Sequence, residues 1–311
     1  MQQEQNNAEK SAPGVPGPNA SFQVPGYHAR YATLADRPAI EQLGRFEWYH
    51  CGEEIFHIYW QSAVYIVVVK DETGEIVAYD SYNKLSNDVY MGFQLCVHPN
   101  ERGKRLTRMF KTMDKSDFRC LGDQTPDSLL RFPGQIFAGK SLGFYGRIQE
   151  KSAPAQWQEA CRIEPMSEDR HFASVVEYDR RLFDGLLHRA SFLKKWCFPK
   201  RGSIHGFSFV ALGFSASYST SDKLLGWGVM RRWPEYWQIN PVYAESAEAA
   251  AGLLHALSLQ LDSGDFVFVR GPAACRSLLQ FVHRQALVFI DEVEERCYRL
   301  FPLDMKMPLI V

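Results

Sequence analysis

The order of predicted elements in the first half of the sequence returns in the second half at nearly the same spacing. Asp36, which starts an amphipathic segment, lies 63 positions before Pro99, and Asp179 lies 62 positions before Pro241. Around each proline the pattern changes from a strand-like apolar run to helical periodicity. The spacing favours two copies of one α+β unit, although landmarks in two unrelated mixed domains can also agree by chance.

Length and composition narrow the class of protein. The 311 residues, 46% of them hydrophobic, are enough for two ordinary domain cores. A net charge of -1 argues against a nucleic-acid partner held by bulk electrostatics. Seven cysteines give an odd count without a CxxC pair or a metal-ligand spacing, which favours reduced thiols, a cytoplasmic location and no metal site. No signal peptide or membrane-spanning run is recognisable, so we expect no membrane partner.

Composition also suggests domain boundaries. Residues 1–26 are rich in Gln, Asn, Pro and Gly, and we expect a disordered leader there. The predicted first domain covers 27–150 and the second covers 167–303. A polar linker over 151–166 separates them, and a tail over 304–311 ends the chain.

Local patterns predict the elements of the first domain. An alternating run ends at Thr33 and is followed by a helix that carries Ile40 and Leu43. Residues 62–85 have the two β-branched runs and the central turn of a hairpin, and 88–97 read as a third strand. We expect 128–151 to form an apolar segment, a short helix, and a Gly-Phe turn into a strand.

The second half shows the same order. Residues 175–193 read as a helix, and 206–214 and 224–233 as strands. Residues 236–257 again predict a strand, a proline and a helix.

The segment "VHPNERGKRLTRMF", residues 97–110, joins the third strand to a helix. It places four cations within seven residues, at Arg102, Lys104, Arg105 and Arg108. A helix start offers unpaired N–H groups to an anion, and Gly103 allows close approach of the backbone to a diphosphate. The proline favours divergence of the strand, which would leave the main chain at Leu95 to Val97 available to an extended, amide-containing ligand.

This segment resembles the acyl-coenzyme A motif of the GNAT superfamily of N-acyltransferases, V-x-P-x-x-R-G-x-G-x-G/A. In that family the strand pairs with pantetheine amides, and the loop and helix start hold the pyrophosphate. The resemblance covers residues 27–150 and, more faintly, the second half. It implies an α+β protein of two GNAT-like domains, each a twisted, mostly antiparallel sheet flanked by helices.

The resemblance assigns coenzyme-binding roles to one continuous part of the chain. Arg102 and Gly103 match the family pattern, and Lys104 occupies a position where any residue is accepted. Arg105 and Thr107 stand where small residues, most often glycine, are usual. The implied coenzyme-binding residues are Leu95, Cys96, Val97, Arg102, Gly103, Lys104, Arg105, Leu106 and Thr107.

A solvated basic helix face is the alternative for this segment. The second copy has Glu245 and no glycine at the corresponding place, which argues against a coenzyme there.

The proton-transfer residues of an acyltransferase are harder to place. Family members often use a glutamate and a tyrosine at positions that here hold Met91 and Gly139. Neither can transfer a proton. Substitutes near the central strands are Asp80, Tyr82, Asp88 and Tyr90, while Gln94 or Cys96 could line the acyl end. Each has an ordinary structural explanation as a sheet or strand-end residue.

The segment between the first helix and the hairpin is expected to form the acceptor wall. Its aromatic residues Trp48, Tyr49, Phe56 and Trp60 could shape a substrate pocket, although helical packing explains them almost as well.

The resemblance implies an acyl-CoA-dependent N-acyltransferase, with acetyl-CoA as co-substrate and a small-molecule or peptide primary amine as acceptor. The alternative is a catalytically inactive GNAT-fold protein that binds coenzyme A or a protein partner. The residues do not identify the acceptor or the oligomeric state.

Overall fold

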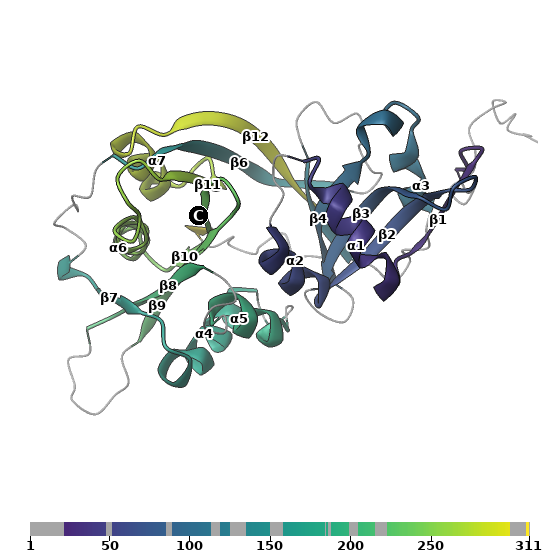
Figure 1. The fold of residues 1–311 in the computed structure, drawn as a ribbon. Coiled ribbons are helices and arrows are strands. Elements are labelled where there is room, and N and C mark those ends of the chain that lie inside the picture. The colour runs from purple at the N-terminus through teal and green to yellow at the C-terminus, as the bar shows by residue number, and fades with distance from the viewer. Residues whose placement is uncertain are drawn as a thin grey trace, which may run out of the picture.

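The fold is described from a computed structural model, shown in Figure 1. It describes residues 22–47, 52–84, 89–112, 119–124, 135–149, 158–183, 185, 188–198, 205–214, 223–298 and 309–310. Residues 1–21 of the predicted disordered leader lie outside the described residues, whereas Phe22 and Val24 pack against the core, so the ordered chain begins before Tyr27. Among the described residues, no helix is both long and apolar enough to cross a bilayer.

The first half forms strands of one sheet with helices on both faces. Its strands are β1 (Tyr27–Tyr31), β2 (Ala63–Lys70), β3 (Ile76–Lys84), β4 (Val89–Val97), β5 (Arg119–Gln124) and β6 (Gln135–Arg147). Its helices are α1 (Arg37–Gly44), α2 (Gly52–Trp60) and α3 (Met109–Thr112), with 3-10 turns η1 (Leu34–Asp36), η2 (Pro99–Glu101) and η3 (Leu106–Arg108). The predicted helix, hairpin and third strand are confirmed.

Alternation along β2 explains how this sheet buries both faces. Tyr65 and Val67 pack on the core that includes Ile40 of α1, while Ile66 packs with Phe110 of α3 on the other face. All are buried, which accounts for the nearly continuous apolar run in the sequence. The helix after the basic segment is thereby fixed against the sheet.

The second half repeats this arrangement. Its strands are β7 (Arg162–Pro165), β8 (Gly206–Leu212), β9 (Leu224–Arg232), β10 (Trp237–Ala244), β11 (Phe266–Pro272), β12 (Val288–Tyr298) and β13 (Leu309–Ile310). Its helices are α4 (Glu168–Leu182), α5 (Ala190–Cys197), α6 (Ala247–Ser258) and α7 (Arg276–Arg284). The predicted strands and the final helix are confirmed, whereas the single helix expected over 175–193 is two helices.

The shared element order confirms the tandem arrangement, but two landmarks occupy different places in the two copies. Asp36 precedes α1, whereas Asp179 lies inside α4. Pro99 follows β4, whereas Pro241 lies within β10, beside a register shift against β9. The matching spacing therefore reflects equivalent elements and not equivalent residues.

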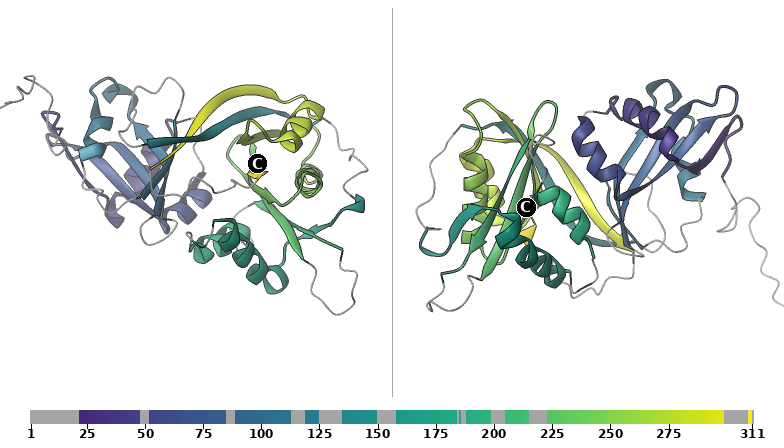
Figure 2. Two further views of the ribbon diagram at one scale, coloured as in Figure 1. Left: turned by 180° about the vertical axis from the view of Figure 1, so that it is seen from behind. Right: turned by 60° about the horizontal axis from the view of Figure 1, so that its bottom comes forward.

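The two halves exchange strands. The sheet order is β1-β2-β3-β4-β5-β12-β6-β11-β10-β9-β8-β7, so β12 pairs with β5 of the first half and β6 pairs with β11 of the second. Figures 1 and 2 show β6 and β12 as a long curved pair between the halves. The predicted boundary near residue 150 falls between β6 and β7, but the hydrogen-bonded sheet includes strands from both sides of it, and β7 lies inside the predicted linker over 151–166.

One local expectation is wrong. The short helix and Gly-Phe turn predicted within 128–151 are, where described, one strand from Gln135 to Arg147. Its pairing with β11 and β12 over most of its length supplies the backbone bonds that a helix would make internally. Long-range pairing outweighs the local glycine signal.

Aromatic side chains join the equivalent helices α2 and α5. The ring of Tyr59 lies 5.6 Å from that of Trp196 and 6.0 Å from that of Phe192. Both Tyr59 and Trp196 are buried in a core that spans the two halves. The halves therefore form one packed body in addition to sharing a sheet.

Candidate functional site

A fork opens between β4 and β5 in the first half. The two strands pair in parallel only at Val89–Met91 with Arg119–Leu121. Beyond Met91, no described strand lies against β4 on the β5 side. An extra residue in β4 shifts its register against β3 between Gly92 and Leu95, which increases local twist and bends the strand. The predicted divergence of the strand is present, and it starts earlier than Leu95.

The loop after β4 has the backbone shape that a glycine-rich sequence would give. Gly103 has φ +84° and nothing within 4 Å of an added Cβ, so conformation, not space, requires glycine there. Arg105 has φ 63°, in the left-handed region that costs a non-glycine residue about 1–2 kcal/mol. The sequence departs from the small residue usual at this position, but the backbone keeps the conformation that glycine adopts. Residues that alternate between right-handed and left-handed backbone conformations can turn successive N–H groups toward one anion.

Arg102 is held by two partners at the loop. Its Nε donates to the Val97 carbonyl at 3.1 Å, and its Nη2 donates to Glu47 Oε1 at 2.9 Å. The guanidinium is about half exposed. One of the predicted phosphate-binding cations is thus positioned by the end of β4 and already paired with a carboxylate.

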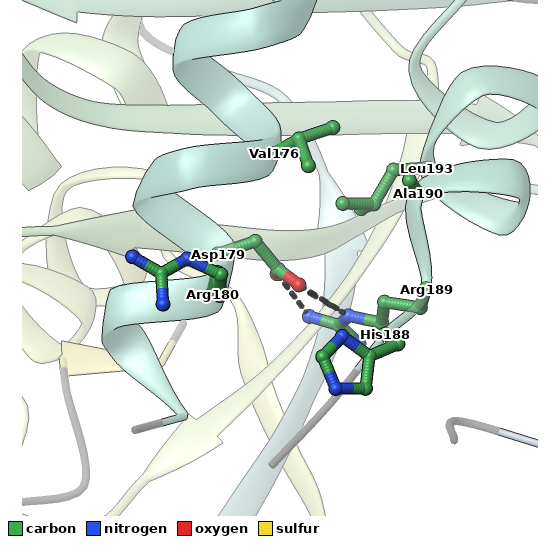
Figure 3. A pocket seen from close by; sticks show the side chains of 7 residues that line it. All are labelled: Val176, Asp179, Arg180, His188, Arg189, Ala190 and Leu193. Carbon is green, nitrogen blue, oxygen red and sulfur yellow. Dashed lines mark hydrogen bonds and ion pairs between the residues drawn. The ribbon is translucent and has the colours of Figure 1, made fainter. Parts of the chain in front are cut away.

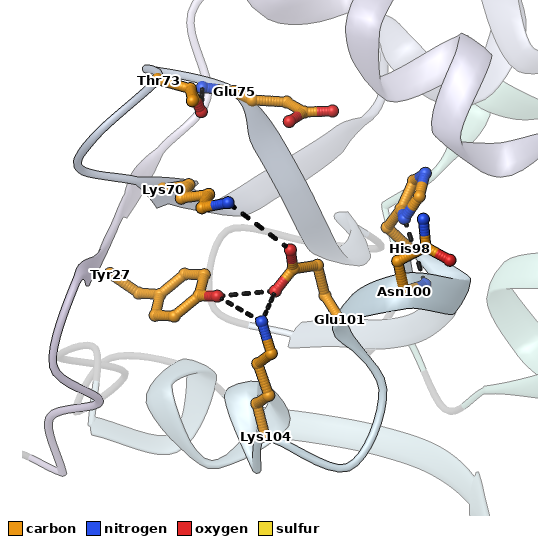
Figure 4. A network of polar contacts seen from close by, with 8 residues as sticks. All are labelled: Tyr27, Lys70, Thr73, Glu75, His98, Asn100, Glu101 and Lys104. Atoms are coloured by element: carbon orange, nitrogen blue, oxygen red, sulfur yellow. Dashed lines mark hydrogen bonds and ion pairs between the residues drawn. The ribbon is translucent and has the colours of Figure 1, made fainter.

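Lys104 belongs to a second polar network, shown in Figure 4. Its Nζ lies 2.5 Å from Glu101 Oε2 and 2.8 Å from Tyr27 Oη, and Tyr27 donates to the same carboxylate oxygen at 2.6 Å. Lys70 lies 4.0 Å from the other oxygen. Hydrogen bonds from Lys104 and Tyr27 lower the pKa of Glu101. The loop therefore contains an anion that competes with any phosphate.

Arg105 differs from these two cations. Within the described part of the chain its exposed guanidinium makes no ion pair or hydrogen bond. The N–H groups of Arg105, Leu106 and Thr107 likewise donate to no described acceptor. Leu106 itself is buried and anchors the turn on the sheet.

The β4 residues next to the loop have separate roles. Leu95 is 40% exposed, while Cys96 is buried with its Sγ donating to the Leu43 carbonyl at 3.2 Å. Burial, with a smaller effect of Glu47, raises the pKa of Cys96 to about 12. Its thiol is therefore packed toward α1.

Gln94 is equally buried. Tyr79 Oη donates to its side-chain oxygen at 3.1 Å, and its main chain bonds both ways with Ser81 Oγ.

Of the four acid-base candidates, two are brought together. Tyr82 is buried on β3, and its hydroxyl donates to the carboxylate of half-buried Asp80. Asp88 lies outside the described residues, and Tyr90 is described only as part of β4. Met91 stands on β4 and Gly139 on β6.

The predicted acceptor wall is only partly recovered. Phe56 is buried in the core, and Trp48 and Tyr49 lie outside the described residues. Trp60 borders a shallow pocket of about 350 Å³ whose other walls include Tyr31, Leu34 and Tyr65. This pocket lies where β1 ends and β2 begins, at the opposite end of the strands from the basic loop.

A buried ion pair in the second half was not anticipated from sequence. A cavity of about 120 Å³ lies beside α4 and α5. Figure 3 shows Asp179 and Arg189, two of its lining residues, pointing toward each other. Their closest atoms are 2.6 Å apart, and Arg189 also donates to Tyr243 Oη at 3.1 Å. The two charges are separated by ten positions without a motif, so only the fold reveals the pair.

The second half lacks the basic loop. Two residues separate β10 from α6, and the first, Glu245, pairs with Lys223 at 2.6 Å. The second, Ser246, caps α6 by accepting from the N–H of Ala249 at 3.2 Å. The start of α6 is therefore capped by the Ser246 side chain and lies next to the carboxylate of Glu245.

Comparison of the sequence with family models gives a match over residues 175–299, to the model described as an acetyltransferase (GNAT) domain. The second half therefore resembles a GNAT domain in sequence. The match falls on the half without the basic loop. No curated protein matches the chain.

Solved structures show the same fold over nearly the whole chain. A putative acetyltransferase from Pyrococcus horikoshii has a TM-score of 0.64 at 14% identity, covering 93% of this chain and 96% of its own. A tandem GNAT protein from the clavulanic acid biosynthesis pathway has a TM-score of 0.57 at 11% identity, and the match covers 88% of this chain and 99% of that protein. Saccharomyces cerevisiae N-myristoyltransferase with bound myristoyl-CoA has a TM-score of 0.58 at 12% identity, and the match covers 96% of this chain and 91% of that protein. The chain thus has the tandem GNAT fold.

Proposed function

We propose that the first domain binds an acyl-coenzyme A in the fork between β4 and β5 and transfers the acyl group, acetyl in the simplest case, to a primary amine. The pantetheine amides would pair with β4 beyond Met91, and the diphosphate would lie on the loop from Arg102 to Thr107. We further propose a cytoplasmic location.

The observation that carries this proposal is the conformation of the loop at the mouth of the fork. Left-handed backbone at Arg105 costs free energy, and such strain commonly persists where it serves binding. The guanidinium of Arg105, which has no partner among the described residues, lies on the same turn as the N–H groups of Leu106 and Thr107, which have no described acceptor. A diphosphate would satisfy both kinds of donor.

Charge in the loop sets how the phosphates would bind. Arg102 and Lys104 are engaged by Glu47 and Glu101, so a diphosphate must compete for them or bind beside them. Arg105 has no carboxylate partner among the described residues, so a diphosphate would not have to compete for it. It is therefore the cation expected to contribute most to affinity.

Acyl transfer requires a neutral amine, a polarised thioester carbonyl and a proton for the departing thiolate. The Asp80–Tyr82 pair is the best-supported of the four candidates, because the two side chains are hydrogen-bonded on the strand next to β4. In the proposed sequence, the amine attacks the thioester carbon, the tetrahedral intermediate collapses, and the carbon–sulfur bond breaks. Asp80 would accept the proton that the amine nitrogen loses, Tyr82 would give its proton to the thiolate, and Tyr82 would regain a proton from Asp80.

A second function has support from specific residues. Met91 and Gly139 occupy the positions at which the family often carries its base and acid, so the protein could bind coenzyme A without turning it over. Positioning alone still accelerates attack on an activated thioester, so the two functions require an experiment to separate them.

A thiol-release assay with acetyl-CoA over a panel of primary amines separates them. We expect amine-dependent release of coenzyme A that falls at least tenfold in Tyr82→Phe, with Tyr145→Phe as the matched control. Binding of desulfo-coenzyme A without any thiol release would select the non-catalytic function. Absence of both would reject each proposal.

A further inference from the structure

The second domain contains the same fork, between β10 and β11. These strands pair in parallel only at Trp237–Ile239 with Val267–Val269. The register of β10 against β9 shifts between Ile239 and Val242, and β9 then continues to pair with β10 as far as Ala244. One edge of β10 beyond Ile239 is thus separated from β11.

This fork is occupied by the C-terminal strand β13. Ile310 pairs with Tyr243, and Leu309 pairs with Ala244, in antiparallel register. Because β9 covers the other edge of these same residues, β13 lies on the edge that β11 leaves. The mark for the C-terminus lies beside β10 in each ribbon view (Figures 1 and 2).

The surroundings suit a peptide and not a phosphate-bearing ligand. Tyr243 and Ala244 are buried, and the start of α6 is capped by Ser246. The carboxylate of Glu245, between fork and helix, already pairs with Lys223 at 2.6 Å and with Arg181 at 3.6 Å, so neither cation is free to hold a phosphate. An uncharged extended backbone can add strand hydrogen bonds at this edge without meeting unpaired charge.

We propose that the second fork is a binding slot for an extended peptide, and that the chain's own residues Leu309 and Ile310 are its resident occupant. The tail takes the position that the first fork leaves open for a ligand's amides. The fork of the second domain is therefore closed by the chain's own C-terminal strand. This inference holds whether or not the first fork binds coenzyme A.

Hydrogen exchange tests this directly, without any acyl donor. In a chain lacking residues 309–311, exchange of the backbone segment 240–246 should become about tenfold faster, since one or two strand hydrogen bonds are lost. The segment 89–97 in the first domain is the internal control and should not change. A synthetic peptide of residues 306–311 should restore slow exchange, whereas the same peptide N-methylated at Leu309 and Ile310 should not. Unchanged exchange in the truncated chain would overturn the proposal, as would equal protection by the two peptides.

Digestion of the intact chain provides a second measurement in case the truncated chain does not fold. Carboxypeptidase should remove Val311 and then stall at Ile310, as read by intact mass. Proline blocks further digestion in any case, so the decisive product is the one that keeps Leu309 and Ile310. Rapid removal of both residues from the folded protein would contradict a seated strand.

Discussion

The ammonium of Lys104 lies 2.5 Å from the carboxylate of Glu101, so the basic loop of the first domain carries its own counter-ion. Tyr27 donates to the same carboxylate, which ties the start of β1 to the loop. Glu101 thus has two effects: it orders the loop, and it opposes the binding of a diphosphate.

Replacement of Glu101 by glutamine separates these effects. Glu101→Gln keeps an oxygen that can accept from Tyr27 but removes the negative charge. We expect coenzyme A to bind about threefold more tightly, because the diphosphate no longer meets the repulsion of one unit negative charge several ångströms away in a partly aqueous setting. Calorimetric titration at low salt measures the change.

Glu75→Gln is the matched control, because Glu75 is exposed on the neighbouring turn. Weaker binding in Glu101→Gln than in this control would show that ordering of the loop matters more than charge.

The left-handed backbone at Arg105 predicts an unusual order of stabilities. Arg105→Gly should be more stable than Arg105→Ala by about 1 kcal/mol, because glycine tolerates positive φ and alanine does not. Urea denaturation of both variants measures the difference. At Arg276, at the start of helix α7, the order should reverse. Equal stabilities of the two Arg105 variants would indicate that the loop adopts another conformation.

Asp36 predicts a pH dependence of stability. Hydrogen bonds, chiefly from Arg30 and then from Thr33, lower its pKa from the ordinary value of 3.8. A lowered folded pKa means that this stabilisation is complete above about pH 4 and is lost progressively as the pH falls further. Asp36→Asn should therefore cost about 1–2 kcal/mol at pH 7 and less at pH 3.5.

Denaturation at the two pH values measures that difference, with Asp262→Asn as the control. A constant difference between wild type and Asp36→Asn would argue against ionisation of Asp36 as the source.

The Asp179–Arg189 pair predicts strong coupling. Both side chains are buried, so Asp179→Ala leaves an uncompensated guanidinium and should lower the free energy of unfolding by about 3–5 kcal/mol. The double variant Asp179→Leu, Arg189→Met should lose much less. A double-mutant cycle by chemical denaturation tests this. Additive losses would mean that the pair does not act as a unit.

Local patterns predicted the elements that local chemistry determines. The β-branched runs gave β2 and β3, and Ile40 and Leu43 lie on the buried side of α1, as their spacing indicates. The basic loop was found for the same reason, since its glycine, proline and cations are contiguous.

Contacts between distant residues could not be predicted in this way. Arg102 pairs with Glu47, 55 positions earlier, and Lys104 contacts Tyr27, 77 positions earlier. Because the sequence does not reveal these pairs, it overstates the positive charge of the loop that is available to a ligand. The exchange of β6 and β12 and the return of β13 to β10 likewise depend on pairing that no local pattern records.

Titration of the full-length protein with acetyl-coenzyme A by calorimetry tests the central claim most directly. We predict saturable heat with one site per chain, and weaker binding in Arg105→Ala with no change in Arg276→Ala. No heat at millimolar coenzyme would contradict the claim. Two equivalent sites per chain would contradict the assignment of binding to the first domain.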